Sequence, residues 1–486
     1  MPVKTQSTDL FRNHKDLYQF LAKSQQVSIE KKCTQILSIS LAVEPVEPLA
    51  VLYAYSKPHQ LHFYIEQKLQ SSFLPHPHKQ GIYGLWNPKK TQSTLSIAAI
   101  DTVAHLTLEG SQRFAKAKDF IDFCLENTLK IGDIEVPYAG PHFFCNFTFF
   151  DHNLNAQSAF PPATIFLPRW QISRQKDSCI LVTNIGVNPH TNLEDLIDEV
   201  SQECQTIRSI QYSTPLIDLN HRDRLSQQDV TDTDQFKSAA LDSLNTIKKH
   251  QLHKVVLAHA IDVTSPIPLH PIYSLNNLRQ LYPDCYVFST SNGRGQSFIG
   301  ASPERLISMR ESSLITDALA GSAPRGKTMA LDAHLAHQLL SSQKERYEHR
   351  VVVDFIVQHL QDLGLTPDYA VLPQLLRLSN IQHLHTPMQA QVPRHIHPLE
   401  ILGKLHPTPA VAGVPRESAC EQIRAYETFE RGLYAAPLGW VDYRGNCEFI
   451  VGIRSALMDG YQARLYAGAG IVAGSNPNQE LAEIQL

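Results

Sequence analysis

The amino-acid sequence predicts an α+β fold. Short segments with the alternation of polar and apolar residues that is typical of strands are mixed irregularly with segments of helical periodicity. Several strand segments follow one another closely enough to form hairpins, which indicates antiparallel pairing rather than a doubly wound parallel sheet. No internal repeat and no low-complexity tract interrupts this pattern.

The N-terminal part of the chain is expected to consist mainly of strands. The predicted strands are 35–46, 61–65, 95–108, 142–150, 163–170 and 179–184. A helix is predicted over 111–128, because four apolar side chains would lie on one side of it: Phe114, Ala117, Phe120 and Ile121. The polar segment 188–232 is expected to hold one helix and a loop. There we place the boundary between an N-terminal part, 1–230, and a C-terminal part, 231–486.

In the C-terminal part, helices and strands are expected to alternate. The predicted helices are 238–250, 274–282 and a long helical region, 331–363, which contains little Gly or Pro. The predicted strands are 254–263, 285–289, 297–299 and 305–309, with further strands and turns over 438–474.

Composition limits the classes of function. The chain has 486 residues, with 43 Lys and Arg against 47 Asp and Glu, and this net charge of −4 argues against a general nucleic-acid binder. Hydrophobic residues make up 43% of the chain, which is typical of a globular protein that buries a large core. The eight cysteines form no CxxC pair, which favours reduced thiols over a disulfide framework.

No membrane association is expected. No apolar run approaches the ~20 residues that cross a bilayer. The first twenty residues have neither the apolar core nor the cleavage site of a secretory signal. We therefore expect a cytoplasmic protein, or one in an organelle stroma if a transit peptide has been removed.

Two pairs of glutamates have the spacing that places side chains on one helix face. Glu345 and Glu348 form one pair, and Glu480 and Glu483 form the other near the C-terminus. Two helices that face each other could hold Mg²⁺ between such carboxylates. The alternative is that both pairs lie on solvated helix faces, and the spacing alone favours this alternative.

A cluster of glycines suggests an anion site near the C-terminus. Gly468, Gly470 and Gly474 could expose backbone amides in a turn that binds a carboxylate. A dinucleotide site is excluded, because only 12 residues follow Gly474 and no βαβ unit can form in them. A tight turn between two strands is the structural alternative.

Two further residues could carry acid–base chemistry. Lys254 begins an apolar strand, and burial would lower the pKa of its amine and make it a general base. Glu304 follows a strand and a turn, where a partly buried carboxyl could act as an acid. The alternatives are an exposed edge lysine and a turn carboxylate that pairs with Arg305. The 23 histidines show no zinc-site spacing, so most of them are expected to be ordinary polar residues.

Eight segments of the C-terminal half stand out as motifs. In order they are KVVLAHAIDV (254–263), FIGASPERL (298–306), ALAGSAPRG (318–326), KERYEHRVVVDFI (344–356), LHPTPAVAG (405–413), FERGLYAAPLGWVD (429–442), FIVGIRSAL (449–457) and YAGAGIVAGSNPNQELAE (466–483). In this order they resemble the motifs of the chorismate-utilising enzymes, a superfamily that includes anthranilate synthase component I, aminodeoxychorismate synthase, salicylate synthase and isochorismate synthase. The N-terminal half matches more loosely, through AGPHFFCNFTFFD at 139–151.

The resemblance implies a fold and a reaction. The fold is one large α+β domain in which two antiparallel sheets pack together, flanked by helices. Lys254 is typical of members that use water as the nucleophile, and Ala320 stands where aminodeoxychorismate synthases carry a nucleophilic lysine. Isochorismate synthase, an isomerase that converts chorismate reversibly to isochorismate, therefore fits best. Salicylate synthase, an amine-using synthase and a catalytically weakened chorismate-binding protein remain alternatives.

The same resemblance implies roles for individual residues. Lys254 would activate a water molecule that attacks C2 of chorismate, and Glu304 would protonate the C4 hydroxyl as it leaves. Glu348 and Glu483 would hold Mg²⁺, with Glu345 and Glu480 beside them or ligating through water. Residues that would bind the substrate are Gly321, Ser322, His383, Ala410, Tyr434, Arg454, Ala467, Gly468 and Gly470.

Two positions depart from the family pattern. His259 stands where an arginine is frequent, and the lysine that usually follows the last motif is missing after Leu486, so a shortened C-terminus and weakened substrate binding are expected. The product is expected to serve menaquinone or phylloquinone synthesis. The chain is expected to act as a monomer, with chorismate as its small-molecule substrate and no nucleic-acid partner.

Overall fold

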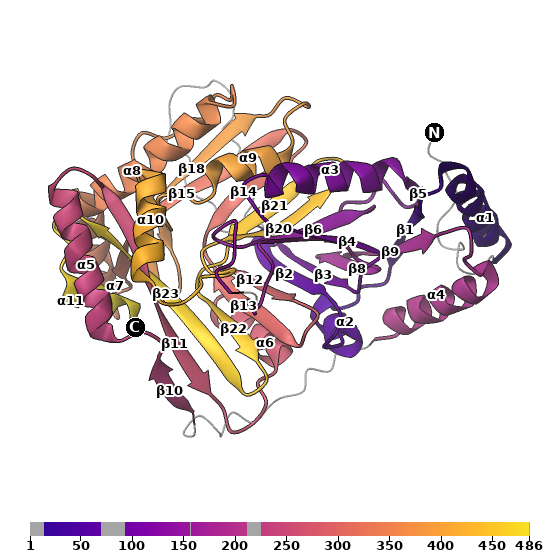
Figure 1. Ribbon diagram of the computed structural model, residues 1–486, viewed down its shortest axis with the longest axis horizontal. Coiled ribbons are helices and arrows are strands. Elements are labelled where there is room, and N and C mark those ends of the chain that lie inside the picture. Colours follow the sequence, from indigo (N-terminus) through magenta and orange to yellow (C-terminus); the bar gives the residue numbers. More distant parts are fainter. Residues whose placement is uncertain (1–13, 70–92, 156, 211–224, 486) are drawn as a thin grey trace.

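A computed structural model describes residues 14–69, 93–155, 157–210 and 225–485. Two large β-sheets pack against each other, and helices cover their outer faces and one end (Figure 1). The predicted α+β class, with two packed antiparallel sheets in one domain, is confirmed.

In the residues that the structure describes, the first sheet has thirteen strands. All of its neighbours pair antiparallel, except that β1 and β5 run parallel. Along the sheet the strands are β10 (Ser226–Asp229), β11 (Lys254–Thr264), β23 (Gln462–Val472), β22 (Ser455–Asp459), β13 (Gln296–Ser302), β12 (Tyr286–Ser291), β2 (His62–Leu69), β3 (Ser93–Ile100), β8 (Trp170–Gln175), β9 (Ser178–Val187), β1 (Gln35–Val43) and β5 (Thr128–Gly132), and β19 (Gly413–Val414) pairs with β11.

The second sheet has ten strands within the described ranges, and all of their pairings are antiparallel. Strands from both parts of the chain meet in each sheet: β2 pairs with β12 in the first sheet, and β6 pairs with β20 in the second. The order is β16 (Asp368–Tyr369), β18 (Ile381–Gln391), β15 (Ser313–Pro324), β14 (Arg305–Arg310), β21 (Cys447–Val451), β20 (Pro437–Asp442), β6 (His142–Phe147), β7 (Ala163–Leu167) and β4 (Ala104–Leu108), and β17 (Gln374–Arg377) pairs with β18.

Eleven helices occur in the described residues. Helices α1, α2, α4 and α6 pack on the first sheet, α3, α8 and α9 lie over the second, and α5, α10 and α11 gather beside β11 and β23 (Figure 1). Their bounds are α1 His14–Lys31, α2 Pro48–Tyr55, α3 Arg113–Glu126, α4 Leu193–Arg208, α5 Thr233–Lys248, α6 Pro271–Leu281, α7 Met329–Ser341, α8 Gln343–Gln361, α9 Pro398–Leu405, α10 Arg416–Tyr426 and α11 Pro477–Ile484.

In β3 of the first sheet, alternate residues serve two separate cores. In β3, Leu95 and Ile97 belong to the core between the sheets, whereas Ala98 and Ile100 belong to the core under the outer helices of the first sheet. This follows from the two-residue period of a strand, which directs successive side chains to opposite faces. Both faces of the first sheet are therefore buried.

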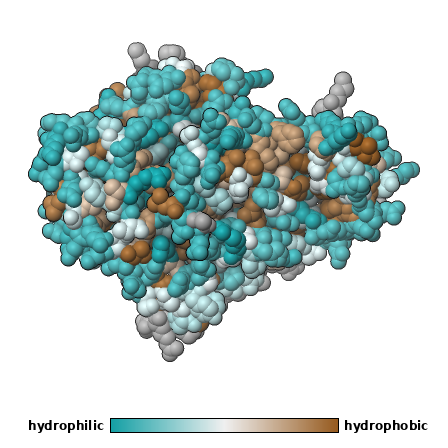
Figure 2. Space-filling view, in the orientation of Figure 1, coloured by the Kyte–Doolittle hydropathy of each residue, from teal (hydrophilic) through white to brown (hydrophobic). Residues whose placement is uncertain are grey.

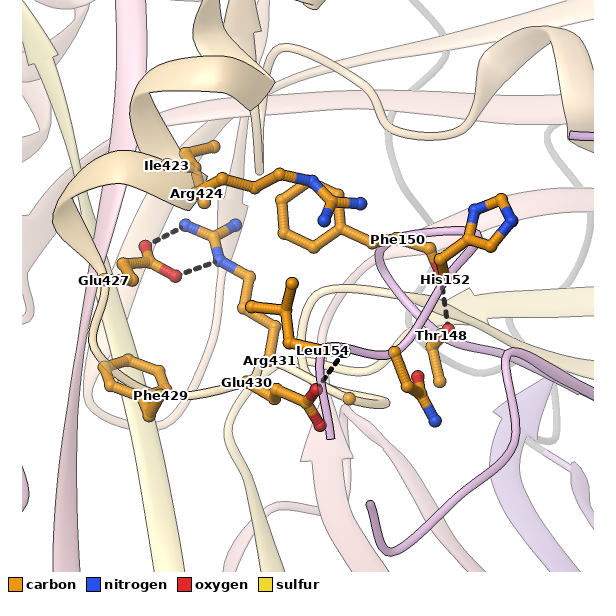
Figure 3. A pocket seen from close by; sticks show the side chains of 12 residues that line it. Thr148, Phe150, His152, Leu154, Ile423, Arg424, Glu427, Phe429, Glu430 and Arg431 are labelled. Carbon is orange, nitrogen blue, oxygen red and sulfur yellow. Dashed lines mark hydrogen bonds and ion pairs between the residues drawn. The ribbon is translucent and has the colours of Figure 1, made fainter. Parts of the chain in front are cut away.

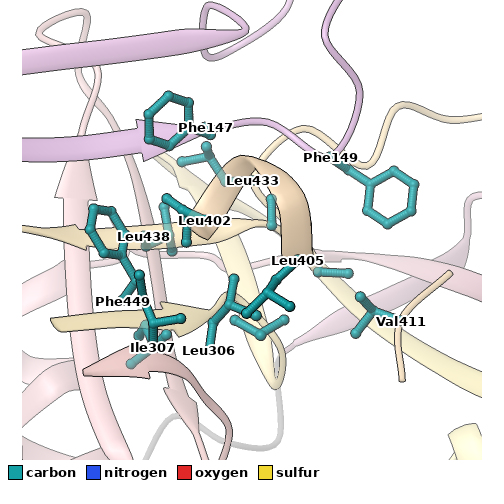
Figure 4. Close-up of a cluster of buried hydrophobic side chains, with 14 of the residues drawn as sticks. Phe147, Phe149, Leu306, Ile307, Leu402, Leu405, Val411, Leu433, Leu438 and Phe449 are labelled. Carbon is teal, nitrogen blue, oxygen red and sulfur yellow. The ribbon is translucent and has the colours of Figure 1, made fainter. Parts of the chain in front are cut away.

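Polar and aromatic contacts connect the two sheets. The rings of Phe63 in β2 and Phe144 in β6 lie 5.1 Å apart. Tyr286 in the first sheet donates a hydrogen bond of 3.0 Å to Glu448 in the second. The α9 helix adds Leu402 and Leu405 to the hydrophobic core beside the second sheet (Figure 4).

The view in Figure 2 shows a face on which hydrophilic residues predominate and hydrophobic residues form scattered patches. Within the part of the chain that the structure describes, no helix is long and apolar enough to cross a membrane.

Two predicted elements are wrong in extent. The helical region 331–363 is two helices, because Ser342 ends α7 and its side chain accepts the Glu345 amide as the N-cap of α8. The apolar stretch 95–108 is two strands in different sheets, separated at Asp101, whose φ is 61°. The sequence pattern predicts no element at α1, α2, α9, α10, β15 or β18.

The core between the sheets gives a stability prediction. Phe144 is fully buried and its ring also lies 5.7 Å from that of Phe166. Phe144→Ala should lower the free energy of unfolding by about 3–5 kcal/mol, because it leaves a cavity between the sheets. Phe123→Ala is the matched control, since 56% of Phe123 is exposed, and it should change stability by less than about 0.5 kcal/mol. Urea unfolding measures both, and equal effects would contradict the assigned core.

Candidate active site

Lys254 stands at the start of β11 and is fully buried. Its Nζ donates a hydrogen bond of 2.7 Å to Oε1 of Glu348, which α8 carries from the other side of the site. The predicted exposed-lysine alternative is therefore excluded. A buried ammonium group is stable only with such a partner.

Gly470 leaves room for this ion pair. A Cβ at Gly470 would lie 2.6 Å from Oε1 of Glu348 and 3.1 Å from Cε of Lys254. Gly468 has a similar role, because a Cβ there would lie 2.6 Å from the hydroxyl oxygen of Tyr434. The predicted glycine turn is wrong for both residues: they lie within β23, opposite Val256 and Ala258 of β11.

The amides of Gly468 and Gly470 in β23 nevertheless point away from β11. The Val256 amide donates to the Ala412 carbonyl and the Ala258 amide donates to Glu427, so both point away from β23. In an antiparallel ladder the residues opposite them, Gly470 and Gly468, direct their own amides away from β11.

Those amides point to the side of β23 on which β22 lies. Pairing of β22 with β23 ends at the pair formed by Ser455 and Tyr466. Arg454 directly precedes Ser455 in the chain. The backbone of Arg454 has a φ of 51°, the left-handed region, at this point. A cationic side chain and two amides therefore border the same end of β22. Ala467 and His259 form a hydrogen-bonded pair, so the backbone groups of Ala467 bond to β11. Only its side chain could contact a substrate.

A chain of hydrogen bonds connects Arg454 to α8. Its Nη2 donates to Nε2 of His383 at 2.9 Å, and the other ring nitrogen of His383 lies 2.9 Å from Oγ of Ser322. Burial and the charge of Arg454 lower the pKa of His383 to about 3, so the ring is neutral and donates to Ser322. The Ser322 amide donates to Oε2 of Glu345 at 3.3 Å.

Gly321 leaves room for the contact between the Ser322 amide and Glu345. It stands at a bulge in β15 with a φ of 78°, and a Cβ there would lie 3.2 Å from Oε2 of Glu345. The structure therefore brings three predicted residues, Gly321, Ser322 and His383, next to Arg454 and Glu345.

The four predicted carboxylates gather between α8 and α11. Burial and the charges of Glu480, Glu345 and Glu348 raise the pKa of Glu483 to about 7. Lys344 lies among them, 3.0 Å from Oε1 of Glu480 and 3.7 Å from Glu345. With all groups ionised, the four carboxylates and the ammonium groups of Lys254 and Lys344 carry a formal charge of −2.

This cluster is not a preformed chelate. In the described ranges, no three His, Cys, Asp or Glu side chains are arranged to hold a metal ion. Mg²⁺ takes one or two protein carboxylates and completes its shell with water or substrate oxygens. The donor type and the mutual repulsion of these carboxylates therefore fit a hard divalent cation.

Glu304 is buried in the turn between β13 and β14. Burial raises the pKa of its carboxyl to about 8; the charge of Lys254 opposes this rise and that of Asp317 adds to it. The alternative that Glu304 pairs with Arg305 is excluded, because Arg305 binds Asp317 at 2.9 Å. At neutral pH, Glu304 is a protonated acid.

The last two residues predicted to bind the substrate are Tyr434 and Ala410. Tyr434 is buried, and its ring stacks on Tyr466 with the centroids 5.2 Å apart. Ala410 is half-buried in the loop that follows α9.

Residues 20–486 match the family described as chorismate binding enzyme. The chain belongs to the chorismate-binding enzymes. Its alignment with the isochorismate synthase MenF of Bacillus subtilis is 29% identical and covers 90% of this chain and 92% of that protein. The salicylate biosynthesis isochorismate synthase of Pseudomonas aeruginosa is 39% identical, over 51% of this chain and 52% of that protein.

Solved structures of the family share the fold. The menaquinone-specific isochorismate synthase MenF of Escherichia coli superposes with a TM-score of 0.72 and 25% identity, covering 96% of this chain and 97% of that one. Anthranilate synthase component I of Streptococcus pneumoniae gives 0.66 at 20% identity, over 85% and 94%.

Two residues near Glu304 could not be singled out from the sequence: Asp317, whose charge acts on Glu304, and its partner His385. Asp317 accepts hydrogen bonds from Arg305 and from His385, the latter at 2.9 Å. Burial would raise the pKa of Asp317, but these two partners hold it well below its usual range. The sequence signal for His385 was the HLH pattern at 383–385, because strand periodicity places both histidines on one face.

None of the predicted site residues lines the cavity of Figure 3. Its lining includes Arg424, Glu427 and Arg431, and its volume of about 20 Å³ is room for about one water molecule. A larger cavity of about 310 Å³ lies beside Arg279 and Tyr282. Lys254 and Glu304 line neither cavity.

Protonation of Glu304 gives a prediction about stability. Because the folded pKa is about 8 and the ordinary value is 4.5, the folded protein holds a proton that the unfolded chain loses over this pH window. Wild-type stability should therefore fall, relative to Glu304→Gln, as pH rises from about 4.5 to about 8. Each pH unit contributes about 1.4 kcal/mol at most.

Urea unfolding of both proteins across this pH range tests the prediction. The free energy of unfolding of Glu304→Gln minus that of the wild type should rise with pH. It should level off above the pKa that Glu304 has in the folded protein. A difference independent of pH would show that Glu304 ionises normally.

Proposed function

We propose that this chain is an isochorismate synthase that converts chorismate reversibly to isochorismate with Mg²⁺. The observation that carries the proposal is one buried site that holds both an amine, Lys254, and a protonated carboxyl, Glu304. Water addition at C2 with loss of the C4 hydroxyl requires a base and an acid together. Two relatives with this activity in their names, from Bacillus subtilis and Escherichia coli, cover nearly the whole chain.

In the proposed reaction, Lys254 acts in its neutral amine form and takes a proton from a water molecule as the oxygen attacks C2. The ring double bonds shift, the bond between C4 and its hydroxyl breaks, and Glu304 protonates the leaving oxygen to give water. One water molecule enters and one leaves, so substrate and product are isomers. In the reverse direction the two residues exchange their roles, which makes the reaction reversible.

The carboxylate cluster is proposed to hold the metal. Glu348 and Glu483 would bind Mg²⁺, and Glu345 and Glu480 would orient its water ligands. When bound, the cation acts as a Lewis acid that draws electron density toward the ring carboxylate of the substrate. Its charge of +2 also balances the formal charge of the cluster.

The enolpyruvyl carboxylate is proposed to bind at the other end of the site. Arg454 supplies a guanidinium group there, and the amides of Gly468 and Gly470 point to the same side of β23. The neutral His383 fixes the side chain of Arg454 through its Nε2. Tyr434 and Ala410 would form the walls against the substrate ring.

We further propose that the product enters menaquinone synthesis. The Bacillus subtilis and Escherichia coli relatives that align over the full length support this branch. Expression of the chain in a host that lacks its own isochorismate synthases should restore menaquinone. No menaquinone in a host that contains active enzyme would redirect the product to another pathway.

The first test is product analysis. The purified chain with chorismate should give isochorismate only when Mg²⁺ is present, and chorismate and isochorismate should reach the same mixture from either side. Salicylate and pyruvate as products would instead make the chain a salicylate synthase. No product under any condition would leave a chorismate-binding protein.

Lys254→Ala tests the base. The variant should lose at least about 100-fold in kcat, because no other amine replaces it at C2, while chorismate binding is largely kept. Lys248→Ala at the exposed end of α5 is the matched control and should be fully active. Turnover of Lys254→Ala at the wild-type rate would exclude the proposed mechanism.

Glu348→Gln tests the metal site. Removing this carboxylate should raise the Mg²⁺ concentration needed for half-maximal activity by about 10-fold or more. Glu421→Gln, an exposed carboxylate on α10, is the control and should leave the metal response unchanged. An unaltered metal response in Glu348→Gln would remove this residue from the site.

A further inference from the structure

Glu427 and Arg431 form a buried ion pair that the proposed mechanism does not use. The side chain of Arg431 is 1% exposed and that of Glu427 is 5% exposed. Nε of Arg431 donates a hydrogen bond of 2.8 Å to Oε2 of Glu427 (Figure 3). Burial of two charges is costly unless further hydrogen bonds satisfy both groups, so their other partners decide what the pair does.

Those partners belong to the backbone around the active site. Nη1 of Arg431 donates to the Val411 carbonyl at 2.8 Å, and Nη2 donates to the Val256 carbonyl at 2.7 Å. Oε1 of Glu427 accepts the Ala258 amide at 2.8 Å. One ion pair therefore joins β11, two and four residues after Lys254, to the loop that follows α9.

The same pair contacts the predicted walls of the site. Val411 directly follows Ala410, and the Tyr434 amide donates to the Arg431 carbonyl at 2.8 Å. The guanidinium carbon of Arg431 lies 5.7 Å from the centre of the Tyr434 ring. On the opposite side of β11, Val256 and Ala258 face Gly470 and Gly468.

We propose that Glu427 and Arg431 are positioning residues for chorismate conversion. Together they hold the strand that carries Lys254 in a fixed relation to the Ala410 loop and the Tyr434 wall. This inference rests on the proposed function for its catalytic consequence, whereas the contacts themselves do not depend on the reaction.

The geometry requires arginine. Three nitrogens of one planar group point at three acceptors from different parts of the chain. A lysine keeps the positive charge beside Glu427 but offers a single nitrogen, which cannot meet the same three directions. Arg431→Lys therefore separates the positioning role from simple charge neutralisation.

Arg113→Lys is the matched control. Arg113 is also buried and donates to two carbonyls, those of Phe150 and Pro162, but it makes none of the contacts of Arg431. Both variants should lower the unfolding temperature. Arg431→Lys alone should lower kcat, by about 10- to 100-fold, with a smaller change in KM, because the base is misplaced relative to bound chorismate.

Hydrogen exchange of the Ala258 amide provides a readout that does not depend on activity. Exchange should be faster in Arg431→Lys than in the wild type and unchanged in Arg113→Lys. Wild-type exchange in Arg431→Lys, or equal losses of kcat in both variants, would overturn the inference. An inactive wild type would refute the proposed function, and the exchange rates would still decide whether the pair holds β11.

If Arg431→Lys does not fold, Glu427→Gln replaces it in the test. Glu427→Gln keeps a side-chain oxygen for the Ala258 amide and removes only the charge that Arg431 faces. It should reproduce the loss of kcat relative to Arg113→Lys, and wild-type kcat in this variant would overturn the inference.

Discussion

The hydrogen-bonded ion pair between Lys254 and Glu348 is the contact on which the site depends. It joins the first residue of a strand in the first sheet to a helix that covers the second sheet. Other features serve this contact: Gly470 leaves the space for it, and Ser342 begins α8 at the residue that places Glu345 and Glu348 on the inner face. Burial of charged groups is costly unless an opposite charge and hydrogen bonds compensate them, and this pair provides both.

The carboxyl groups on the two sides of Lys254 have different neighbours. Glu348 and Glu480 each form an ion pair with a lysine and belong to a cluster of carboxylates. Glu304 is buried, the described residues place no hydrogen-bonded cation on it, and burial together with the negative Asp317 raises its pKa. One small region thereby offers both an acid and a place for a cation, as the proposed reaction requires.

The site forms where the chain passes from one sheet to the other. Glu304 lies in the turn between β13 of the first sheet and β14 of the second. The first sheet contributes Lys254 and the glycines of β23, and the second contributes Ser322 and His383 from β15 and β18. The contacts of Arg431 follow the same principle, because they tie β11 to a loop that starts from the helices over the second sheet.

Periodicity and local motifs, which are properties of neighbouring positions, were enough to predict the α+β class, most strands and the residues that could carry the chemistry. It could not determine that Gly468 and Gly470 lie inside a strand, that Arg305 pairs with Asp317 rather than Glu304, or that Arg431 reaches β11. These depend on which distant segments pack together. Long-range packing alone determines which carboxyl groups pair with a cation and which do not, and the pKa of Glu304 is raised because this packing removes its carboxyl group from water.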